Sequence, residues 1–264
     1  MEFISQAKAK KQTGLSYLGN VASSVKIAKN KKKGVLTYIL YLAPASKSGY
    51  NVCPMATGGD GITIGCIDAC LDESGHNRID VKENRINKAR INKTKLFFED
   101  RDFFMGWLVA ELTAHKVKAE KKGFEFSVRL NGTSDLSMLQ FKHEGKNILE
   151  LFSDVQFYDY TKVLNRYKIC EQYSNYDITF SYSGKNWLEC EAAIKYGHRI
   201  AVVFEKRLPK TYMGIPVINA DETDLRYMDD NNVICGLIHK KTRRKIDIAA
   251  QSFIVPDVDK NCEY

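Results

Sequence analysis

The chain has 264 residues, of which 44% are hydrophobic and 27% charged, an ordinary composition for a globular protein with a full core. Its longest apolar stretch, 35–45, is too short to span a membrane, and its first residues lack the apolar region of a signal peptide. Seven cysteines, an odd number, favour reduced thiols in a cytoplasm over a disulfide framework, so neither a membrane protein nor a secreted one is expected.

The net charge of +8 is unevenly distributed. Basic residues gather in the first 33 residues and again between Lys240 and Lys245. Such patches can bind the phosphates of a nucleic acid, which makes nucleic acid a candidate partner of both segments. A solvated surface explains them equally well, because no aromatic stacking motif lies inside either basic run.

In chain order, residues 1–33 are polar and basic and predict a loosely held N-terminal arm. Residues 35–42 are rich in β-branched and aromatic side chains and predict a strand. A polar helix is expected over about 80–95 and a stronger one from Asp100 to Lys122, because acidic residues precede its apolar repeat and basic residues end it.

From residue 124 onward, short apolar runs alternate with helical patterns. Six further strands are expected at 124–130, 155–158, 177–180, 199–204, 215–218 and 233–238, with helices at 147–152, 163–171 and 187–196. Alternation of this kind predicts a parallel sheet in an α/β fold. Seven strands suggest a closed or partial TIM-like barrel over residues 34–255, a single domain followed by a short tail at 256–264.

In parallel α/β folds the functional residues lie at the carboxyl ends of the strands. Polar side chains follow most of the predicted strands, so we expect them at one rim. They are Asn131, Thr133, Asp135, Tyr158, Asp159, Tyr160, Lys162, Ser181, Ser183, Asn219 and Asp221.

A loop rich in glycine and cysteine follows the first strand and therefore reaches the same rim. It contains Cys53, Cys66 and Cys70, spaced C-x12-C-x3-C. Three thiolates suit a four-iron iron–sulfur cluster (4Fe–4S) that keeps one iron open for a substrate. His76 could instead complete a zinc site of three cysteines and one histidine. A loop with no bound metal is the third alternative.

The segments CPMATGGDGITIGCIDACL, RLNGTSD, QFYDYTK, ITFSYSGKN and PVINADETDLRYMD resemble an uncharacterised bacteriophage protein family. Its signature is Cys-Pro-x-Ala-Thr followed by Gly-Cys-x-x-x-Cys-Leu, and the resemblance extends over about residues 35 to 255. It implies a phage-encoded protein that works in the host cytoplasm.

The cysteine loop is more distantly similar to the radical S-adenosylmethionine superfamily, in which a partial barrel binds a cluster through C-x3-C-x2-C. Cys66 and Cys70 match the first interval, but Glu73 stands where the third cysteine would fall. The resemblance implies that Cys53 supplies the third ligand. It also implies S-adenosylmethionine as a cofactor, near Asn131, Thr133 and Ser134.

Two other groups of rim residues could carry chemistry. Tyr158, Tyr160 and Lys162 could transfer protons and bind a carboxylate or phosphate, although an aromatic layer capped by a surface lysine explains them as well. Four aspartates at strand ends could bind Mg²⁺ or could simply cap helices: Asp135, Asp159, Asp221 and Asp224.

The sequence thus predicts a metal–thiolate enzyme that acts on a nucleotide, a nucleic acid or a small metabolite. Cys53, Cys66 and Cys70 are the expected metal ligands, and the expected catalytic residues are Tyr158, Tyr160, Lys162 and Asp135. The expected cofactor-binding residues are Asn131, Thr133, Ser134, Ser181 and Ser183. The alternatives are a zinc-stabilised nucleic-acid-binding protein and a Mg²⁺-dependent phosphoryl-transfer enzyme or nuclease.

Overall fold

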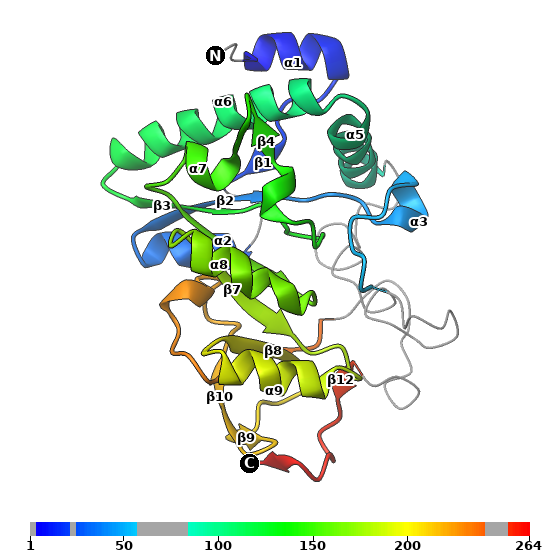
Figure 1. The fold of residues 1–264 in the computed structure, drawn as a ribbon, viewed down its shortest axis with the longest axis vertical. Helices are drawn as coiled ribbons and strands as arrows, with labels where there is room; N and C mark the ends of the chain where they lie inside the picture. The colour runs from blue at the N-terminus through cyan, green and yellow to red at the C-terminus, as the bar shows by residue number, and fades with distance from the viewer. Residues whose placement is uncertain (1–3, 22–24, 57–83, 241–252) are drawn as a thin grey trace. The chain divides into compact units, whose positions relative to one another are not determined.

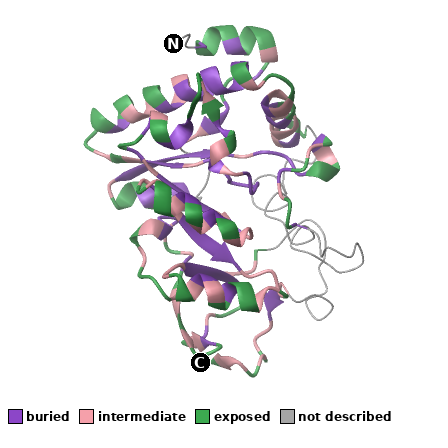
Figure 2. Cartoon of the chain, in the orientation of Figure 1, coloured by how far each residue is buried: buried purple, intermediate pink, exposed green. Residues whose placement is uncertain are grey.

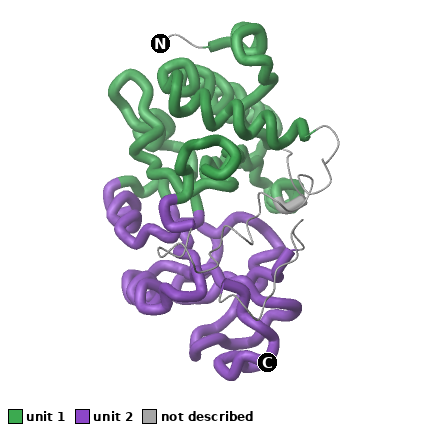
Figure 3. Tube along the Cα trace, turned by 90° about the vertical axis from the view of Figure 1, so that its right-hand side faces the viewer, with its two compact units in different colours: residues 1–53, 80–159, 173–176 green, residues 54–79, 160–172, 177–264 purple. Residues whose placement is uncertain are grey.

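The computed structural model describes residues 4–21, 25–56, 84–240 and 253–264 (Figure 1). Cys66, Cys70, His76 and most of the basic run between Lys240 and Lys245 lie outside these ranges. The chain divides into two compact units: unit 1 contains 1–53, 80–159 and 173–176, and unit 2 contains 54–79, 160–172 and 177–264 (Figure 3). In the described ranges, no helix is both long and apolar enough to cross a membrane.

Unit 1 is built on the strands β1 (Gly19–Asn20), β2 (Val35–Leu40) and β3 (Glu125–Arg129), with the first four residues of β6 (Gln156–Thr161). β2, β3 and β6 are parallel neighbours, and β1 pairs antiparallel with β2. Every residue of β2 is buried, which is typical of a central parallel strand covered on both faces.

Helices cover both faces of the unit 1 sheet. α6 (Arg101–Glu120) packs on β2 and β3, whereas α2 (Val25–Lys32) contacts β2 and lies on the other side of the sheet (Figure 1). α6 begins where the sequence predicts, because the Asp100 side chain accepts a hydrogen bond from the Phe103 backbone N–H at 3.3 Å. The inward side of α6 contributes the fully buried Phe104 and Trp107, while its outward side is exposed (Figure 2).

Smaller elements complete unit 1. They are α1 (Gln6–Thr13), α3 (Ala45–Ser48), α5 (Arg85–Glu99), α7 (Ile148–Leu151), the 3-10 helix η2 (Met138–Gln140) and the hairpin of β4 (Lys142–His143) with β5 (Lys146–Asn147). α5 packs on α6 and on α3. Asn147 begins α7 with a capping box, in which its side chain accepts from Glu150 N–H and the Glu150 carboxylate accepts from Asn147 N–H.

Unit 2 also has a mostly parallel sheet. Its central strands are β7 (Tyr176–Ser181, from Asp177), β8 (Arg199–Phe204) and β11 (Ile234–Ile238), with β10 (Ile215–Asn219) parallel to β11 and β12 (Ile254–Val255) parallel to β8. β9 (Thr211–Tyr212) pairs antiparallel with β10 and with β13 (Cys262–Glu263). α9 (Trp187–Lys195) packs on β8. The remaining elements are α8 (Tyr167–Gln172), η3 (Leu164–Arg166) and η4 (Arg226–Met228).

The structure confirms an α/β fold with a large, mostly parallel sheet, but it corrects the closed TIM-like barrel. Barrel closure needs both edge strands to pair with further strands. In the described part of the chain, the two-residue strand β1 pairs with β2 alone, and β13 pairs with β9 alone. These short antiparallel strands cover the edges of an open sheet, as edge strands commonly do.

The first 33 residues also differ from the loose arm that their polarity predicts. They contain α1, β1 and α2, and they place Leu18 and Ile27 in the core with 0% and 2% exposure. A few apolar residues are enough to anchor this segment, because it packs against β2 and is hydrogen-bonded to α6.

Candidate functional site

The carboxyl ends of β2, β3 and β6 lie at one edge of the unit 1 sheet, because the three strands are parallel and in register. Ile39 of β2 is level with Arg129 of β3, and Val128 is level with Phe157 of β6. The loop that follows β3, residues 131–135, runs across this edge. We call it the rim loop.

Asn131 is the centre of the rim loop. Its backbone N–H donates to Asp159 Oδ1 at 3.0 Å, and its side-chain Nδ2 donates to Asp159 Oδ2 at 3.0 Å and to the Leu136 carbonyl at 2.9 Å. Its Oδ1 accepts from Ser134 Oγ at 2.7 Å and from Leu136 N–H at 2.9 Å. These four side-chain bonds use the whole capacity of the amide, so we assign Asn131 a positioning role rather than a ligand contact.

Gly132 and Thr133 fasten the rim loop to the end of β2. Gly132 N–H donates to the Leu40 carbonyl at 2.9 Å, and Thr133 Oγ1 donates to the Leu42 carbonyl at 2.6 Å. A Cβ atom on residue 132 would lie 2.6 Å from the Leu40 carbonyl oxygen and 2.7 Å from the Tyr41 ring. This close approach of two backbones requires glycine.

Cys53 and Asp135 join the same edge. The Cys53 thiol donates to the Thr133 carbonyl at 3.8 Å, and Asp135 N–H donates to the Val52 carbonyl at 2.7 Å. The Cys53 side chain is half-buried, whereas Asp135 is 8% exposed. Unit 1 therefore brings one predicted metal ligand together with four other predicted site residues: Asn131, Thr133, Ser134 and Asp135.

The other predicted residues are distributed over both units. Tyr158 is fully buried in unit 1, whereas Tyr160 and Lys162 belong to unit 2, where the Lys162 ammonium lies 5.7 Å from the centroid of the Phe253 ring. Ser181 and Ser183 shape a turn after β7. The Ser181 carbonyl accepts from Asn186 Nδ2 at 3.1 Å, and Ser183 N–H donates to Asn186 Oδ1 at 2.7 Å.

Most of the described cysteines are poor candidates for metal ligands. Burial raises the pKa of Cys170 and of Cys190 to about 12 and that of Cys235 to about 11. A metal binds the thiolate, and burial disfavours this charged form in all three. No group of three His, Cys, Asp or Glu side chains that could hold a metal ion occurs within the described ranges, and Cys66 and Cys70 lie outside them.

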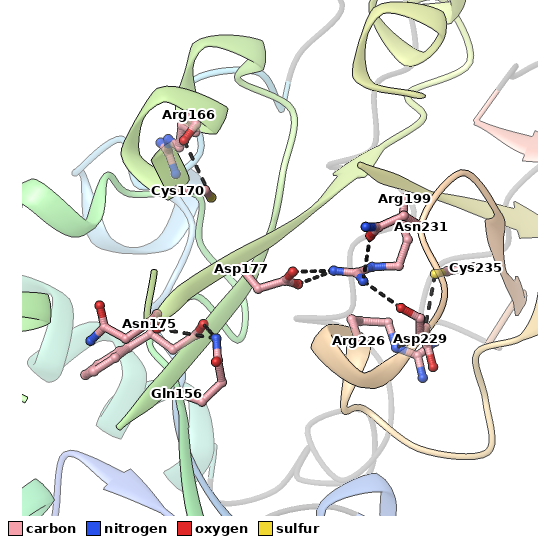
Figure 4. Close-up of polar contacts among 11 residues, drawn as sticks. Gln156, Arg166, Cys170, Asn175, Asp177, Arg199, Arg226, Asp229, Asn231 and Cys235 are labelled. Carbon is pink, nitrogen blue, oxygen red and sulfur yellow. Dashed lines mark hydrogen bonds and ion pairs between the residues drawn. The ribbon is translucent and has the colours of Figure 1, made fainter. Parts of the chain in front are cut away.

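A buried group of charged side chains joins β7, β8 and β11 in unit 2 (Figure 4). The Arg199 guanidinium is paired with both carboxylate oxygens of Asp177, and it also donates to the Asp229 carbonyl at 2.8 Å. Arg226 Nε lies 3.1 Å from Asp229 Oδ2, and the Cys235 thiol donates to the same oxygen at 3.8 Å. Burial raises the pKa of Asp177, and Arg199 partly offsets that shift. Because these charges neutralise one another, we interpret the group as structural.

A second charged group, in unit 1, was not among the predicted site residues. The Glu111 carboxylate accepts from Tyr38 Oη at 2.6 Å and from Leu18 N–H at 2.9 Å, and burial raises its pKa. Burial also lowers the pKa of the nearby Lys93 to about 8, and the charge of Glu111 partly offsets that shift. Lys93 contributes to the core, where its ammonium lies 4.9 Å from the centroid of the Tyr17 ring.

The sequence placed Asp159 at the rim as a Mg²⁺ ligand or a helix cap, whereas the structure makes it the anchor of the rim loop. Both of its carboxylate oxygens accept hydrogen bonds from Asn131. One sequence signal could have revealed this role. Asn131 comes just after one parallel strand, and the carboxylate of Asp159 lies near the end of the next, so the two residues meet at one edge of the sheet.

Comparison with known proteins gives one match. A family model described as Gene product 88 matches residues 5–254, nearly the whole chain. No curated protein and no solved structure matches the sequence.

Proposed function

The chain belongs to the Gene product 88 family of phage proteins, and from this premise we propose that it is a phage enzyme with a metal–thiolate site. Cys53, beside the rim loop of unit 1, would supply one ligand, and Cys66 and Cys70 would supply the others. The metal group would be an iron–sulfur cluster like that of the radical S-adenosylmethionine proteins, which supplies electrons to a bound substrate.

The observation that carries the proposal is the position of Cys53. Its thiol lies against the Thr133 carbonyl, at the carboxyl edge of parallel strands, where α/β proteins bind their ligands. It is half-buried, so it can meet a ligand, whereas Cys190 and Cys235 are fully buried. The rim loop is held rigidly by Asn131, which suits a preorganised site.

The alternatives receive less support. A Mg²⁺ enzyme needs free carboxylate oxygens, but both oxygens of Asp159 accept from Asn131, and Asp221 Oδ2 accepts from Ile238 N–H at 2.8 Å. A zinc-stabilised nucleic-acid-binding protein would bind its metal through the same cysteines. The identity of the bound metal therefore distinguishes this alternative from the leading proposal.

Metal analysis of the full chain, purified without oxygen, tests the proposal. We expect brown protein that contains iron and sulfide, and we expect Cys53→Ser to lose both. Cys262→Ser is the matched control, because Cys262 is another half-buried cysteine but lies in the terminal strand β13. A colourless protein with one zinc ion per chain would favour the zinc alternative, and protein without metal would refute both.

A further inference from the structure

The helix α5 carries an unusual excess of positive charge. Its fifteen residues include five cationic side chains and a single acidic one, Glu99. The cationic residues are Arg85, Lys88, Arg90, Lys93 and Lys95. A helix of this composition is stabilised by its packing on α6 and α3 rather than by ion pairs along its own surface.

Three of these cations form a row on the outer face of α5, which we call the basic stripe: Arg85, Lys88 and Lys95. At 100° per residue they lie within an arc of about 80°, and all three are exposed. The side chains of Thr94 and Phe97 turn to the opposite face, where both are fully buried. Lys88 and Lys95 are two turns apart, about 10.5 Å along the axis.

Two residues of the basic stripe, Lys88 and Lys95, have no acidic partner within ion-pair distance among the described residues. The Glu99 carboxylate accepts from the Tyr50 hydroxyl at 2.8 Å instead. Two solvent-facing lysines that no described carboxylate neutralises favour an anionic partner with regularly spaced charges.

One aromatic ring, that of Tyr50, lies beside the basic stripe, because its hydroxyl donates to Glu99 on the same face of α5. Tyr50 is partly exposed and stacks on Phe98 of α5, with ring centroids 4.5 Å apart and planes 3° from parallel. On the opposite face of α5, the Arg90 guanidinium lies 4.9 Å from the centroid of the Tyr41 ring. Phosphate-binding cations beside partly exposed aromatic rings are the usual features of a surface for unpaired nucleic acid.

α5 is also attached to the candidate site. Thr94 Oγ1 accepts a hydrogen bond from Ala43 N–H at 2.8 Å, just after the end of β2. The ring of Tyr41 approaches both Arg90 and Gly132 of the rim loop. α5 therefore contacts the end of β2, and through Tyr41 the rim loop, with the face opposite the basic stripe, within unit 1.

We propose that the basic stripe of α5 binds the phosphate backbone of a single-stranded nucleic acid and that Tyr50 stacks on one of its bases. The inference names the substrate class of the proposed enzyme, and in that respect it rests on the proposed function. The binding itself requires no metal, so the two proposals can fail separately.

Fluorescence anisotropy of the full chain with a labelled oligothymidylate of about 20 nucleotides tests the proposal. For single strands, each phosphate contact contributes about 0.7 to the slope of log affinity against log salt. Lys88→Gln/Lys95→Gln should therefore lower this slope by about 1.4, which at about 0.1 M salt is a loss of about 25-fold in affinity. Tyr50→Leu should weaken binding without changing the slope.

Lys121→Gln/Lys122→Gln is the matched control, because it removes the same charge from two exposed lysines at the end of α6. We expect it to lower the affinity far less than the change in α5. Equal losses in the two variants, absence of binding by the wild type, or equally tight binding of a DNA duplex would overturn the proposal. Cys53→Ser should keep the binding, and Lys88→Gln/Lys95→Gln should keep the metal, which separates this proposal from the preceding one.

Discussion

Replacing Asn131 by Asp tests whether the rim loop is built on the contact between Asn131 and Asp159. The substitution keeps the size of the side chain but exchanges the donor Nδ2 for a carboxylate oxygen. In the wild type this Nδ2 donates to Asp159 Oδ2 at 3.0 Å and to the Leu136 carbonyl at 2.9 Å. The new oxygen would face a carboxylate and a carbonyl, both buried, and could donate to neither while it is ionised.

The expected loss follows from these two bonds. A hydrogen bond to a charged group contributes about 1.5–3 kcal/mol and a neutral one about 0.5–1.5 kcal/mol, so Asn131→Asp should lower the free energy of unfolding by about 2–4.5 kcal/mol at pH 7. The two facing carboxylates raise the pKa of one of them. The folded state then holds a proton that the unfolded state releases above about pH 3.9, so the loss grows with pH and shrinks in acid.

Urea unfolding followed by tryptophan fluorescence measures this loss. The chain has two tryptophans, and Trp107 is fully buried in unit 1 whereas Trp187 belongs to unit 2. In a Trp187→Phe background, the emission reports on unit 1 alone. The double variant Asn131→Asp/Asp159→Asn places an amide opposite a carboxylate again and should recover about 1.5–3 kcal/mol. The reasoning is refuted if Asn131→Asp stays within about 0.5 kcal/mol of the wild type at pH 7, or if the double variant is no more stable than Asn131→Asp.

Two further predictions concern unit 1. Gly132→Ala would place a Cβ 2.6 Å from the Leu40 carbonyl oxygen, so we expect a loss of about 1–3 kcal/mol in the same urea assay, and an unchanged midpoint would contradict the close approach. Lys93 has a pKa of about 8 when folded against 10.5 in the unfolded chain, so between these pH values only the unfolded state keeps its proton and the stability of the wild type rises with pH. Lys93→Met lacks this term, and its stability relative to the wild type should fall by about 3 kcal/mol over that window; parallel pH profiles would disprove the assignment.

Local patterns predicted the regular elements of the chain well. The buried strand β8 has the bounds that its apolar run predicts, and α6 begins at Asp100 and ends near Lys121 as its charges indicate. Such elements are determined by neighbouring residues, through hydrophobic periodicity and capping. The two-residue strands β1 and β13 carry no such pattern, because only their partners β2 and β9 make them strands.

The topology of the sheet was harder to predict for the same reason. Strand–helix alternation indicates parallel pairing, but it does not indicate whether the first and last strands meet. The short antiparallel strands β1 and β13 at the sheet edges decide against a closed barrel, and neither of them is visible as a run of apolar residues. The count of seven predicted strands therefore overstated the evidence for closure.

The candidate site was predictable in part. Polar residues after a parallel strand led to Asn131, Thr133, Ser134 and Asp135, and the structure gathers these with Cys53. Their chemical roles could not be predicted, because hydrogen bonds across the sheet assign them. Likewise, the cationic residues of the basic stripe can be read from the sequence of α5. The contact with Tyr50 cannot, because Tyr50 lies in another segment that only the folded structure brings next to α5.

Residues 40–43, at the end of β2, hold both proposed surfaces of unit 1. The Leu40 and Leu42 carbonyls accept from the rim loop, while Ala43 N–H donates to Thr94 of α5. Changes to the ligands themselves should leave this segment intact: Cys53→Ser removes only a thiol, and the lysines of the basic stripe point away from it. A variant that loses the metal and the nucleic acid together would therefore indicate a disturbed end of β2 rather than a missing ligand. Only separate losses identify Cys53 and the basic stripe as two distinct binding sites of unit 1.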